Sequence, residues 1–295
     1  MRVITTAKGF SDALEAERAV GRRVGLVPTM GALHAGHRSL VARAADECDV
    51  VAVTVFVNPL QFDAAEDLAT YPRDLDGDVA QAGSAGAAIV FAPPVQEMYP
   101  GFPAPVATSV HVDAVGDVLE GASRPGHFDG VATVVAKLCS LAGRGRVYFG
   151  EKDFQQLAVV RRMVADLSLP VEIVACPTVR EHDGLALSSR NVRLSADGRR
   201  AAVALHRALI AGLGALDAGE RDPARVGAFM TEVLTTADGV VPDYAVAVDA
   251  ATLAPPPRLG GEVRLLVAAT VGDVRLIDNT GLVLERAETP VGVQG

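Results

Sequence analysis

The segment Val50–Val57 is the feature that most constrains the fold. It is a nearly continuous run of valine and phenylalanine, interrupted only by alanine and threonine and ended by Asn58-Pro59. A strand with one face in water would alternate polar and apolar residues. An unbroken apolar run is instead typical of a strand that is buried on both faces of a parallel sheet. The run therefore predicts an α/β protein.

The residues before about position 176 alternate between short apolar runs and segments with helical spacing, as in strand–helix–strand units. The runs predict further strands at Val24–Val27, Ala88–Phe91, Val147–Phe149 and Val171–Ala175. The spacing predicts helices at His37–Cys48, Asp74–Gly83, Val131–Leu141 and Phe154–Leu167. We interpret the five prolines of Ala92–Thr108 as marking a long surface loop. This alternation favours a doubly wound parallel sheet.

The pattern changes after Pro177, where a smaller α+β domain is expected. Two alanine-rich helices and three strands are predicted, at Ala196–Leu216, Pro223–Ala237, Asp243–Val248, Glu262–Ala269 and Val274–Asp278. Gly272-Asp273 has the composition of a hairpin turn. We therefore expect a first domain at 1–177, a second at 178–288 and a flexible tail at 289–295.

Composition narrows the function classes. Of 295 residues 49% are hydrophobic and 21% are charged, and the formal net charge is −9. An acidic chain is poorly suited to a nucleic acid or an anionic membrane, because both attract cationic surfaces. Three widely spaced cysteines suggest neither a zinc site nor a disulfide framework. With no signal-like or membrane-spanning segment, the sequence predicts a cytoplasmic protein without nucleic-acid or membrane partners.

The segment Pro28–His37 lies where the first buried strand is followed by a helix. Ligands bind at the carboxyl ends of such strands, beside the exposed N–H groups of the next helix. Gly31 and Gly36 allow the backbone to approach a phosphate closely. His34 and His37 can donate hydrogen bonds to phosphate oxygens and to the charge that develops during attack at phosphorus. A turn with two surface histidines is the alternative.

Two further segments carry groups that suit a small polar ligand. Asn58–Phe62 follows a strand, and the amide side chains of Asn58 and Gln61 could recognise a hydroxyl or a carboxylate. Arg124 precedes a helix and is a candidate partner for a carboxylate or a phosphate. A solvated loop residue is the alternative for Gln61 and for Arg124.

The segment Phe149–Gln156 again places a glycine between a strand and a helix. Lys152 is a cation at a helix N-terminus, which is unfavourable unless an anion binds there. Asp153 could orient a ribose, or it could simply cap the helix.

Leu187–Asn191 lies at the expected domain junction. The hydroxyls of Ser188 and Ser189 and the guanidinium of Arg190 can grip the outer phosphates of ATP, although a loop that starts a helix is the alternative. Taken with the preceding segments, this pattern is that of a nucleotidyl-transfer site. The chain contains neither a GxxxxGK[ST] loop nor a GxGxxG motif.

His34–His37 (HxGH), followed later by Ser-Ser-Arg, resembles the HIGH and KMSKS pair of the nucleotidylyltransferase and class I aminoacyl-tRNA synthetase superfamily. More narrowly, the chain resembles the pantothenate synthetase (pantoate–β-alanine ligase) family. Six segments between about residues 27 and 191 carry the resemblance: PTMGALHAGH, FVNPLQF, YPRDLDGD, RPGHFDGV, FGEKDFQQL and PTVREHDGLALSSRN. The region after them is similar in size and pattern.

The resemblance implies a Rossmann-like N-terminal domain, a C-terminal lid and a homodimer. It implies that ATP and pantoate form pantoyl-adenylate and pyrophosphate, and that β-alanine then displaces AMP to give pantothenate. It also implies an ATP site made by Met30, Gly31, Ala32, Leu33, His34, Ala35, Gly36, His37, Gly150, Glu151, Lys152, Asp153, Val179, Leu187, Ser188, Ser189 and Arg190.

Within that site the resemblance implies catalytic roles for His34, His37, Lys152 and Arg190, with His37 as the proton donor. Pantoate is expected at Gln61 and Gln156, with Asn58 and Arg124 as further substrate-binding residues and β-alanine close to Gln61. Magnesium is expected on the ATP phosphates, with Asp78 as a protein partner.

The sequence departs from the family pattern at a few positions. Leu187 stands where methionine is expected, Phe154 stands where tyrosine is common, and Gly77 stands where some members carry an acid. The last departure weakens the assignment of a metal near Asp76 and Asp78. Two alternatives stay open: another adenylyl- or cytidylyltransferase of the superfamily, and a catalytically silent nucleotide-binding module.

Overall fold

The computed structural model describes residues 1–62 and 65–285. Contacts divide the chain into two compact units, Met1–Val179 with Leu187–Ser189 and Arg180–Ala186 with Arg190–Gly295. The expected tail at 289–295 lies outside the described residues. Among the helices of the described ranges, none is long and apolar enough to cross a membrane.

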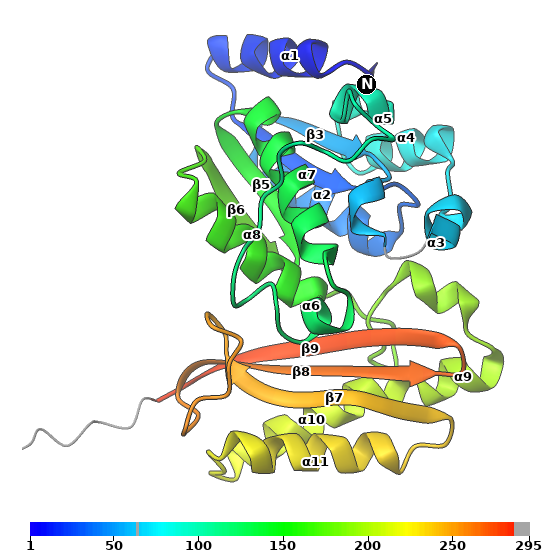
Figure 1. The fold of residues 1–295 in the computed structure, drawn as a ribbon, viewed down its shortest axis with the longest axis vertical. Helices are drawn as coiled ribbons and strands as arrows, with labels where there is room; N and C mark the ends of the chain where they lie inside the picture. The colour runs from blue at the N-terminus through cyan, green and yellow to red at the C-terminus, as the bar shows by residue number, and fades with distance from the viewer. Residues whose placement is uncertain (63–64, 286–295) are drawn as a thin grey trace, which may run out of the picture. The chain divides into compact units, whose positions relative to one another are not determined.

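The first unit is built on a six-stranded sheet whose paired strands are all parallel (Figure 1). The strand order is β1-β4-β3-β2-β5-β6. The strands are β1 (Arg2–Ile4), β2 (Val24–Thr29), β3 (Val50–Val55), β4 (Ile89–Phe91), β5 (Gly145–Gly150) and β6 (Val171–Cys176). The first five residues of β3 are buried, as the apolar run predicts. The predicted α/β fold with a parallel sheet is thus confirmed.

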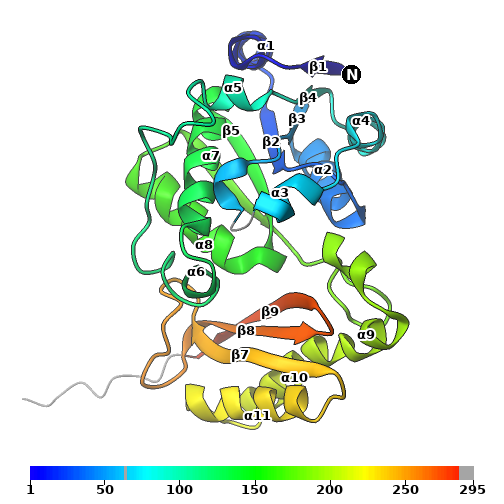
Figure 2. The same ribbon diagram turned by 45° about the vertical axis from the view of Figure 1, so that its right-hand side comes forward.

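Helices cover both faces of this sheet (Figures 1 and 2). On one face α2 (Ala35–Glu47) and α4 (Leu75–Ser84) pack over the central strands, with Leu40, Val41, Ala44 and Ala82 in their core. On the other face lie α1 (Ala7–Ala19), α7 (His127–Ala142) and α8 (Phe154–Asp166). Short helical turns complete the unit: η1 (Pro59–Gln61), α3 (Ala65–Thr70), α5 (Val95–Met98), α6 (Glu120–Ser123) and η2 (Glu151–Asp153).

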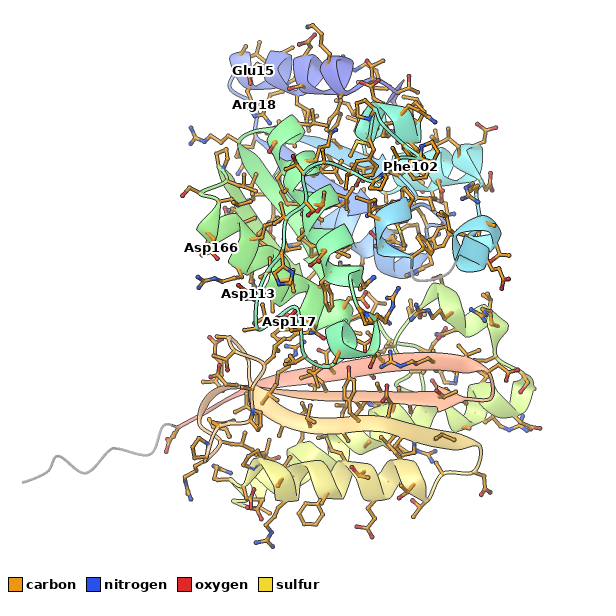
Figure 3. All side chains as sticks on the ribbon, viewed as in Figure 1. Glu15, Arg18, Phe102, Asp113, Asp117 and Asp166 are labelled. Atoms are coloured by element: carbon orange, nitrogen blue, oxygen red, sulfur yellow. The ribbon has the colours of Figure 1, made fainter. Side chains whose placement is uncertain are left out.

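The N-terminal strand β1 and helix α1 were not predicted from the sequence. In α1 Phe10, Ala13 and Leu14 are buried, a spacing that places them on one helical face. Phe10 stacks on Phe91 of β4 with ring centroids 4.4 Å apart. Arg18, labelled with Glu15 in Figure 3, anchors the other end of the helix by donating from Nε to the carbonyl of Arg144 at 2.7 Å.

The interpretation of Ala92–Thr108 as a surface loop without periodicity is wrong for part of the segment. Val95–Met98 forms a helical turn, α5, with Pro94 at its N-cap. Met98 and Tyr99 are buried. The physical reason is that Val95, Met98 and Tyr99 have the i, i+3, i+4 spacing of one apolar helical face.

A buried carboxylate holds the turn between β2 and α2. Gly31 and Ala32 both have positive φ, 87° and 51°, and a non-glycine residue in this region is uncommon. Asp78 of α4 accepts hydrogen bonds from the backbone N–H groups of Ala32 at 3.0 Å and Leu33 at 2.8 Å. A Cβ on Gly31 would lie 2.6 Å from the same carboxylate, so the turn requires glycine there.

The second unit is an antiparallel sheet in the order β7-β8-β9, packed on helices (Figure 2). Its elements are α9 (Ala196–Ala201), α10 (Val203–Asp217), α11 (Pro223–Thr235), β7 (Val240–Asp249), β8 (Gly261–Val271) and β9 (Val274–Leu284). The predicted small α+β unit is confirmed, with Gly272-Asp273 joining β8 to β9. The first predicted helix is interrupted at Ala202, and β9 extends beyond the expected Asp278.

An ion pair fastens the segment 180–186 to β9 within the second unit. Arg180 donates from its two terminal nitrogens to the two carboxylate oxygens of Asp278, at 2.6 and 2.9 Å. The Asp278 side chain is 2% exposed and that of Arg180 is 23% exposed. Removal of one partner from a buried pair leaves the other charge uncompensated.

We expect Asp278→Ala to lower the free energy of unfolding of the second unit by about 3–5 kcal/mol, the usual loss when a buried pair is broken. The matched control is Asp243→Ala, which breaks the more exposed pair of Asp243 with Arg275 in the same sheet. Its loss is expected to be at most about 1 kcal/mol. The loss in each variant is measured by denaturant unfolding, followed by circular dichroism, and by hydrogen exchange in β8 and β9. Equal losses in the two variants would contradict the role given to Asp278.

Candidate active site

Two of the predicted segments of the site lie at the point where the sheet reverses its strand order. From β2 the chain builds outward through β3 and β4, and it later returns to place β5 on the other side of β2. Ligands in open α/β sheets bind at such a switch point, outside the carboxyl ends of the strands. The HxGH segment follows β2, and the segment Gly150–Asp153 follows β5.

The strands β2 and β5 separate at their carboxyl ends. They pair at Gly25 with Arg146 and at Leu26 with Val147, whereas β2 continues to Thr29. Pro28 has no N–H to donate to a neighbouring strand, which is consistent with the end of the pairing. On its other side β2 stays paired with β3 as far as Thr29. The separation lies directly before the two loops that carry the candidate residues.

His34 and His37 begin α2 and hold each other in place. His34 is the N-cap, and its Nδ1 accepts from the backbone N–H of Gly36 at 3.1 Å. The Nδ1 of His37 accepts from the backbone N–H of His34 at 3.4 Å. The two rings are 4.1 Å apart, centroid to centroid. Together these contacts form a capping box in which histidine side chains supply both acceptors.

These contacts also define the protonation of the two rings. Burial lowers the pKa of His37 to about 4, with the neighbouring His34 as a further cause. Burial, and then the charge of Lys152, lower the pKa of His34. Both rings are therefore neutral near pH 7. Because each Nδ1 accepts a hydrogen bond, the proton of each ring is on Nε2. The pair presents two neutral Nε2–H donors.

Lys152 and Asp153 come from the end of β5. Lys152 lies in η2, and its Nζ is 3.7 Å from a carboxylate oxygen of Asp153. The charge of Lys152 acts on both histidine rings, which places its ammonium within electrostatic reach of them. The loops after β2 and β5 thus place His34, His37 and Lys152 at the same edge of the sheet, and their shared role stays a prediction. Asp153 is the N-cap of α8 and makes no side-chain cap hydrogen bond.

Asn58 is buried and makes its hydrogen bonds within the protein. The residue is 1% exposed, and its Nδ2 donates at 3.0 Å to Oε1 of Gln61 and at 3.0 Å to the carbonyl of Gly130. Its Oδ1 accepts from Tyr99 at 2.9 Å and from the backbone N–H of Leu60 at 3.3 Å. These contacts favour a positioning role for Asn58 over the predicted substrate contact.

Arg124 lies beside Gln61, and its predicted contact with a substrate stays a prediction. The backbone carbonyl of Gln61 accepts from Arg124 at 3.2 Å and from Nδ1 of His127 at 2.8 Å. Since Nδ1 of His127 donates, its Nε2 accepts from Arg124, at 3.1 Å. Helix α7 approaches this loop so closely that a Cβ on Gly130 would lie 2.3 Å from the carbonyl oxygen of Leu60.

The adjacent glutamines of α8 have different environments. Gln155 is 3% exposed, and its amide accepts from the backbone N–H of Glu120 and donates to the carbonyls of Val115 and Val118, at 2.6–3.0 Å. It therefore fixes the loop before α6. Gln156 is half-buried, and the described part of the chain offers its amide no hydrogen-bond partner. The amide of Gln156 is thus the one of the two that can bind a ligand.

The remaining predicted residues are placed as follows. Met30, Gly31, Ala32 and Leu33 form the turn held by Asp78, and Ala35 and Gly36 start α2. The backbone N–H of Leu187 donates to the carbonyl of Val179 at 2.9 Å, next to Ser188 and Ser189 in the first unit. Arg190 belongs to the second unit, and its expected role stays a prediction.

Asp78 was expected to be a magnesium partner. The structure uses its two carboxylate oxygens on the backbone of the turn, one on each N–H. This buried carboxylate is not arranged as an open metal ligand, so the residues present do not fit a magnesium site there.

A cluster of acidic residues around His111 lies on the loop before α6, where Figure 3 labels Asp113 and Asp117. His111 lies 3.1 Å from Asp113, 3.9 Å from Asp117 and 2.8 Å from Asp129. The hydrogen bond to Asp129 is the largest cause that raises the pKa of His111. All four side chains are well exposed to solvent, and exposed acidic groups of this kind are common without a bound ion.

Known proteins with similar sequences match this chain over most of its length. The family described as pantoate-beta-alanine ligase matches residues 2–281. A pantothenate synthetase from Moorella thermoacetica is 49% identical over 282 residues, which make up 96% of this chain and 99% of that protein. One from Rubrobacter xylanophilus is 53% identical over 270 residues, or 90% of this chain and 93% of its own length.

Two solved structures of related enzymes are similar to this chain in fold. The crystal structure of pantothenate synthetase from Thermus thermophilus has a TM-score of 0.87 at 48% identity, and the match covers 95% of this chain and 99% of that chain. Pantoate-beta-alanine ligase from Francisella tularensis, complexed with beta-gamma ATP and beta-alanine, has a TM-score of 0.74 at 32% identity, covering 95% and 97%. Sequence, fold and length therefore agree, and this chain belongs to the pantoate–β-alanine ligase family.

Proposed function

We propose that this chain uses ATP to join pantoate to β-alanine through a pantoyl-adenylate, with release of pyrophosphate and then AMP. The observation that carries the proposal is the cluster of two Nε2–H donors and Lys152 at the carboxyl ends of β2 and β5. Such a cluster suits the phosphates of a nucleotide. Family membership and the ligands of the Francisella tularensis neighbour support the substrate classes.

The first step needs little bond-making by the protein, because the pantoate carboxylate is already a nucleophile. Its oxygen attacks the α-phosphorus of ATP, the bond to the β-phosphate breaks, and pyrophosphate carries away the electron pair. Positioning and charge stabilisation therefore dominate. His34 and His37 donate to phosphate oxygens in the neutral state, and Lys152 supplies positive charge to the same group.

The second step joins the amine of β-alanine to the acyl carbon. The C–N bond forms and the nitrogen gives up a proton to solvent, the bond to the adenylate oxygen breaks, and AMP leaves with that electron pair. Gln61 and Gln156 are proposed to hold pantoate, with β-alanine close to Gln61 and Arg124 supporting the loop that carries Gln61. Exclusion of water protects the adenylate from hydrolysis.

Both oxygens of Asp78 already accept hydrogen bonds from the backbone, so we assign the metal no ligand there. Magnesium is instead proposed to enter the reaction as part of the substrate, MgATP. The second unit is proposed to act as a lid that carries Arg190, and the protein is proposed to form a homodimer. Both ideas come from the family resemblance. Sedimentation in solution tests the dimer.

The proposed function is tested by isotope exchange between pyrophosphate and ATP. We expect exchange that depends on pantoate, because only the forward and reverse formation of an acyl-adenylate links the two pools. Pantothenate is expected only when β-alanine is added. Exchange that requires a nucleotide or a phosphorylated alcohol instead of pantoate would favour another nucleotidylyltransferase, and no exchange with any acid would favour a silent binding module.

His37→Ala is expected to lower the single-turnover rate of adenylate formation by about 10²–10³-fold, the usual loss of one donor to transition-state charge. The thermal unfolding curve checks that the variant is folded. An unchanged rate would contradict the role of His37.

The pH profile tests the protonation state of the same residue. The pKa of His37 is about 4, so the neutral, donating form is lost only as the pH falls towards that value. We therefore expect no loss of kcat/KM from this ring between about pH 7.5 and about pH 5.5, where an ordinary histidine titrates. An acid limb near pH 6.5 that disappears in His37→Gln would show that the ring is charged in the working enzyme.

The neighbouring glutamines provide a matched pair of variants. Gln156→Ala is expected to raise the KM for pantoate about 10–100-fold while ATP binding without pantoate stays unchanged, since an unpaired buried polar group on the substrate costs about 1–3 kcal/mol. Gln155→Ala is expected to lower thermal stability, because it leaves the backbone groups of the loop before α6 unpaired. Loss of ATP affinity in Gln156→Ala as large as the loss for pantoate would withdraw the substrate assignment.

A further inference from the structure

A buried tyrosine connects α5 to the loop that carries Gln61. The hydroxyl of Tyr99 donates to Oδ1 of Asn58 at 2.9 Å, and burial raises the pKa of Tyr99, so the phenol keeps its proton. Lys137 holds the tyrosine from the other side: its Nζ lies 5.8 Å from the ring centroid and donates to the carbonyl of Met98. Nothing in the proposed reaction uses this phenol directly.

The amide of Asn58 has one favourable orientation. Its oxygen faces two donors, the Tyr99 hydroxyl and the N–H of Leu60, and its nitrogen faces two acceptors, the Gly130 carbonyl and Oε1 of Gln61. A flipped amide would point N–H groups at the N–H of Leu60 and would point its oxygen at two oxygens. A phenol can accept as well as donate, so the N–H of Leu60 and the carbonyl of Gly130 select this orientation. The hydrogen bond from Tyr99 then holds the buried amide of Asn58 in the place from which it donates to Gln61.

This orientation decides what Gln61 offers to a ligand. Oε1 of Gln61 accepts from Asn58, and its backbone carbonyl accepts from Arg124 and His127. Its Nε2 has no acceptor within the described part of the chain. An amide nitrogen carries two donors and no acceptor. Gln61 thus presents donors, which suit the carboxylate or hydroxyl oxygens of a small acid, whereas a flipped amide would present an oxygen and repel a carboxylate.

We propose that Tyr99 is a positioning residue which, through Asn58, orients the Gln61 amide to donate to the acid substrate. The inference rests on the proposed function in one respect, the contact between Gln61 and pantoate. The Tyr99–Asn58–Gln61 chain of hydrogen bonds acts on recognition of the acid and not on the nucleotide. The reason is that Gln61, which ends the chain, does not belong to the cluster of His34, His37 and Lys152.

The test is Tyr99→Phe, which keeps the ring and removes only the hydroxyl. The KM for pantoate is expected to rise about three- to tenfold, the usual effect of losing one neutral hydrogen bond, while kcat and the KM for ATP change less than about twofold. The matched control is Tyr148→Phe, another buried tyrosine whose hydroxyl contacts Glu47 and Cys48. It is expected to leave the KM for pantoate unchanged.

A double-mutant cycle separates positioning from a general effect on the fold. In a Gln61→Ala background, Tyr99→Phe is expected to add nothing to the KM for pantoate, because the amide through which it acts is absent. An equal rise in both backgrounds, or an equal rise in the KM for ATP, would overturn the inference.

Nuclear magnetic resonance tests the orientation without using the reaction. The side-chain amide signals of Gln61, assigned by their absence in Gln61→Ala, are expected to shift in Tyr99→Phe and to stay in place in Tyr148→Phe. Unshifted signals in Tyr99→Phe would overturn the inference even if the KM rises. A wild-type protein without pantoate-dependent exchange would instead overturn the proposed function, and the amide signals would still decide whether Tyr99 orients Gln61.

Discussion

The carboxylate of Asp78 is the contact on which the candidate site depends. It accepts from two successive backbone N–H groups in a turn where Gly31 and Ala32 have positive φ. A turn of this kind is costly for a non-glycine residue and persists only where other contacts hold it. The turn sets the point at which α2 starts, and hence the position of His34 at the N-cap. An acidic residue on α4 thereby helps to set where the two imidazole rings lie.

Burial and backbone contacts keep the two histidines of the site neutral, although a histidine in solution is partly charged near its ordinary pKa. His34 and His37 are half-buried and accept backbone N–H groups, so both are neutral donors. A neutral ring needs no counter-ion when the site is empty. The positive charge comes from Lys152, which lies on a different strand end. In the proposed reaction, the two histidines would direct hydrogen bonds to the phosphates and Lys152 would supply the positive charge.

Much of this arrangement could be predicted from the sequence. The valine run of β3, the strand ends that precede His34 and Lys152, and the hairpin turn at Gly272-Asp273 are all local patterns, and the structure contains them. Helix α1 carries an equally readable pattern in Phe10, Ala13 and Leu14, which we did not predict.

What could not be predicted depends on contacts between distant parts of the chain. Gln155 and Gln156 are the same residue type side by side, and only the packing of the loop before α6 makes one structural. Asp78 bonds to a backbone N–H 45 residues away in the chain, so no local pattern marks its role. The connection of Tyr99 to Gln61 passes through Asn58 and is likewise invisible without the fold.

The division of the chain into two units has a consequence for how the protein can be taken apart. The three residues Leu187–Ser189 belong to the first unit, while the segments on either side of them, Arg180–Ala186 and Arg190 onward, belong to the second. The backbone therefore passes from one unit to the other three times within about a dozen positions. A single cut in the gene cannot yield either unit whole: a fragment ending at Val179 would lack the serines, and one starting at Arg190 would lack Arg180, the partner of Asp278. Any attempt to study the units separately has to splice the chain rather than truncate it.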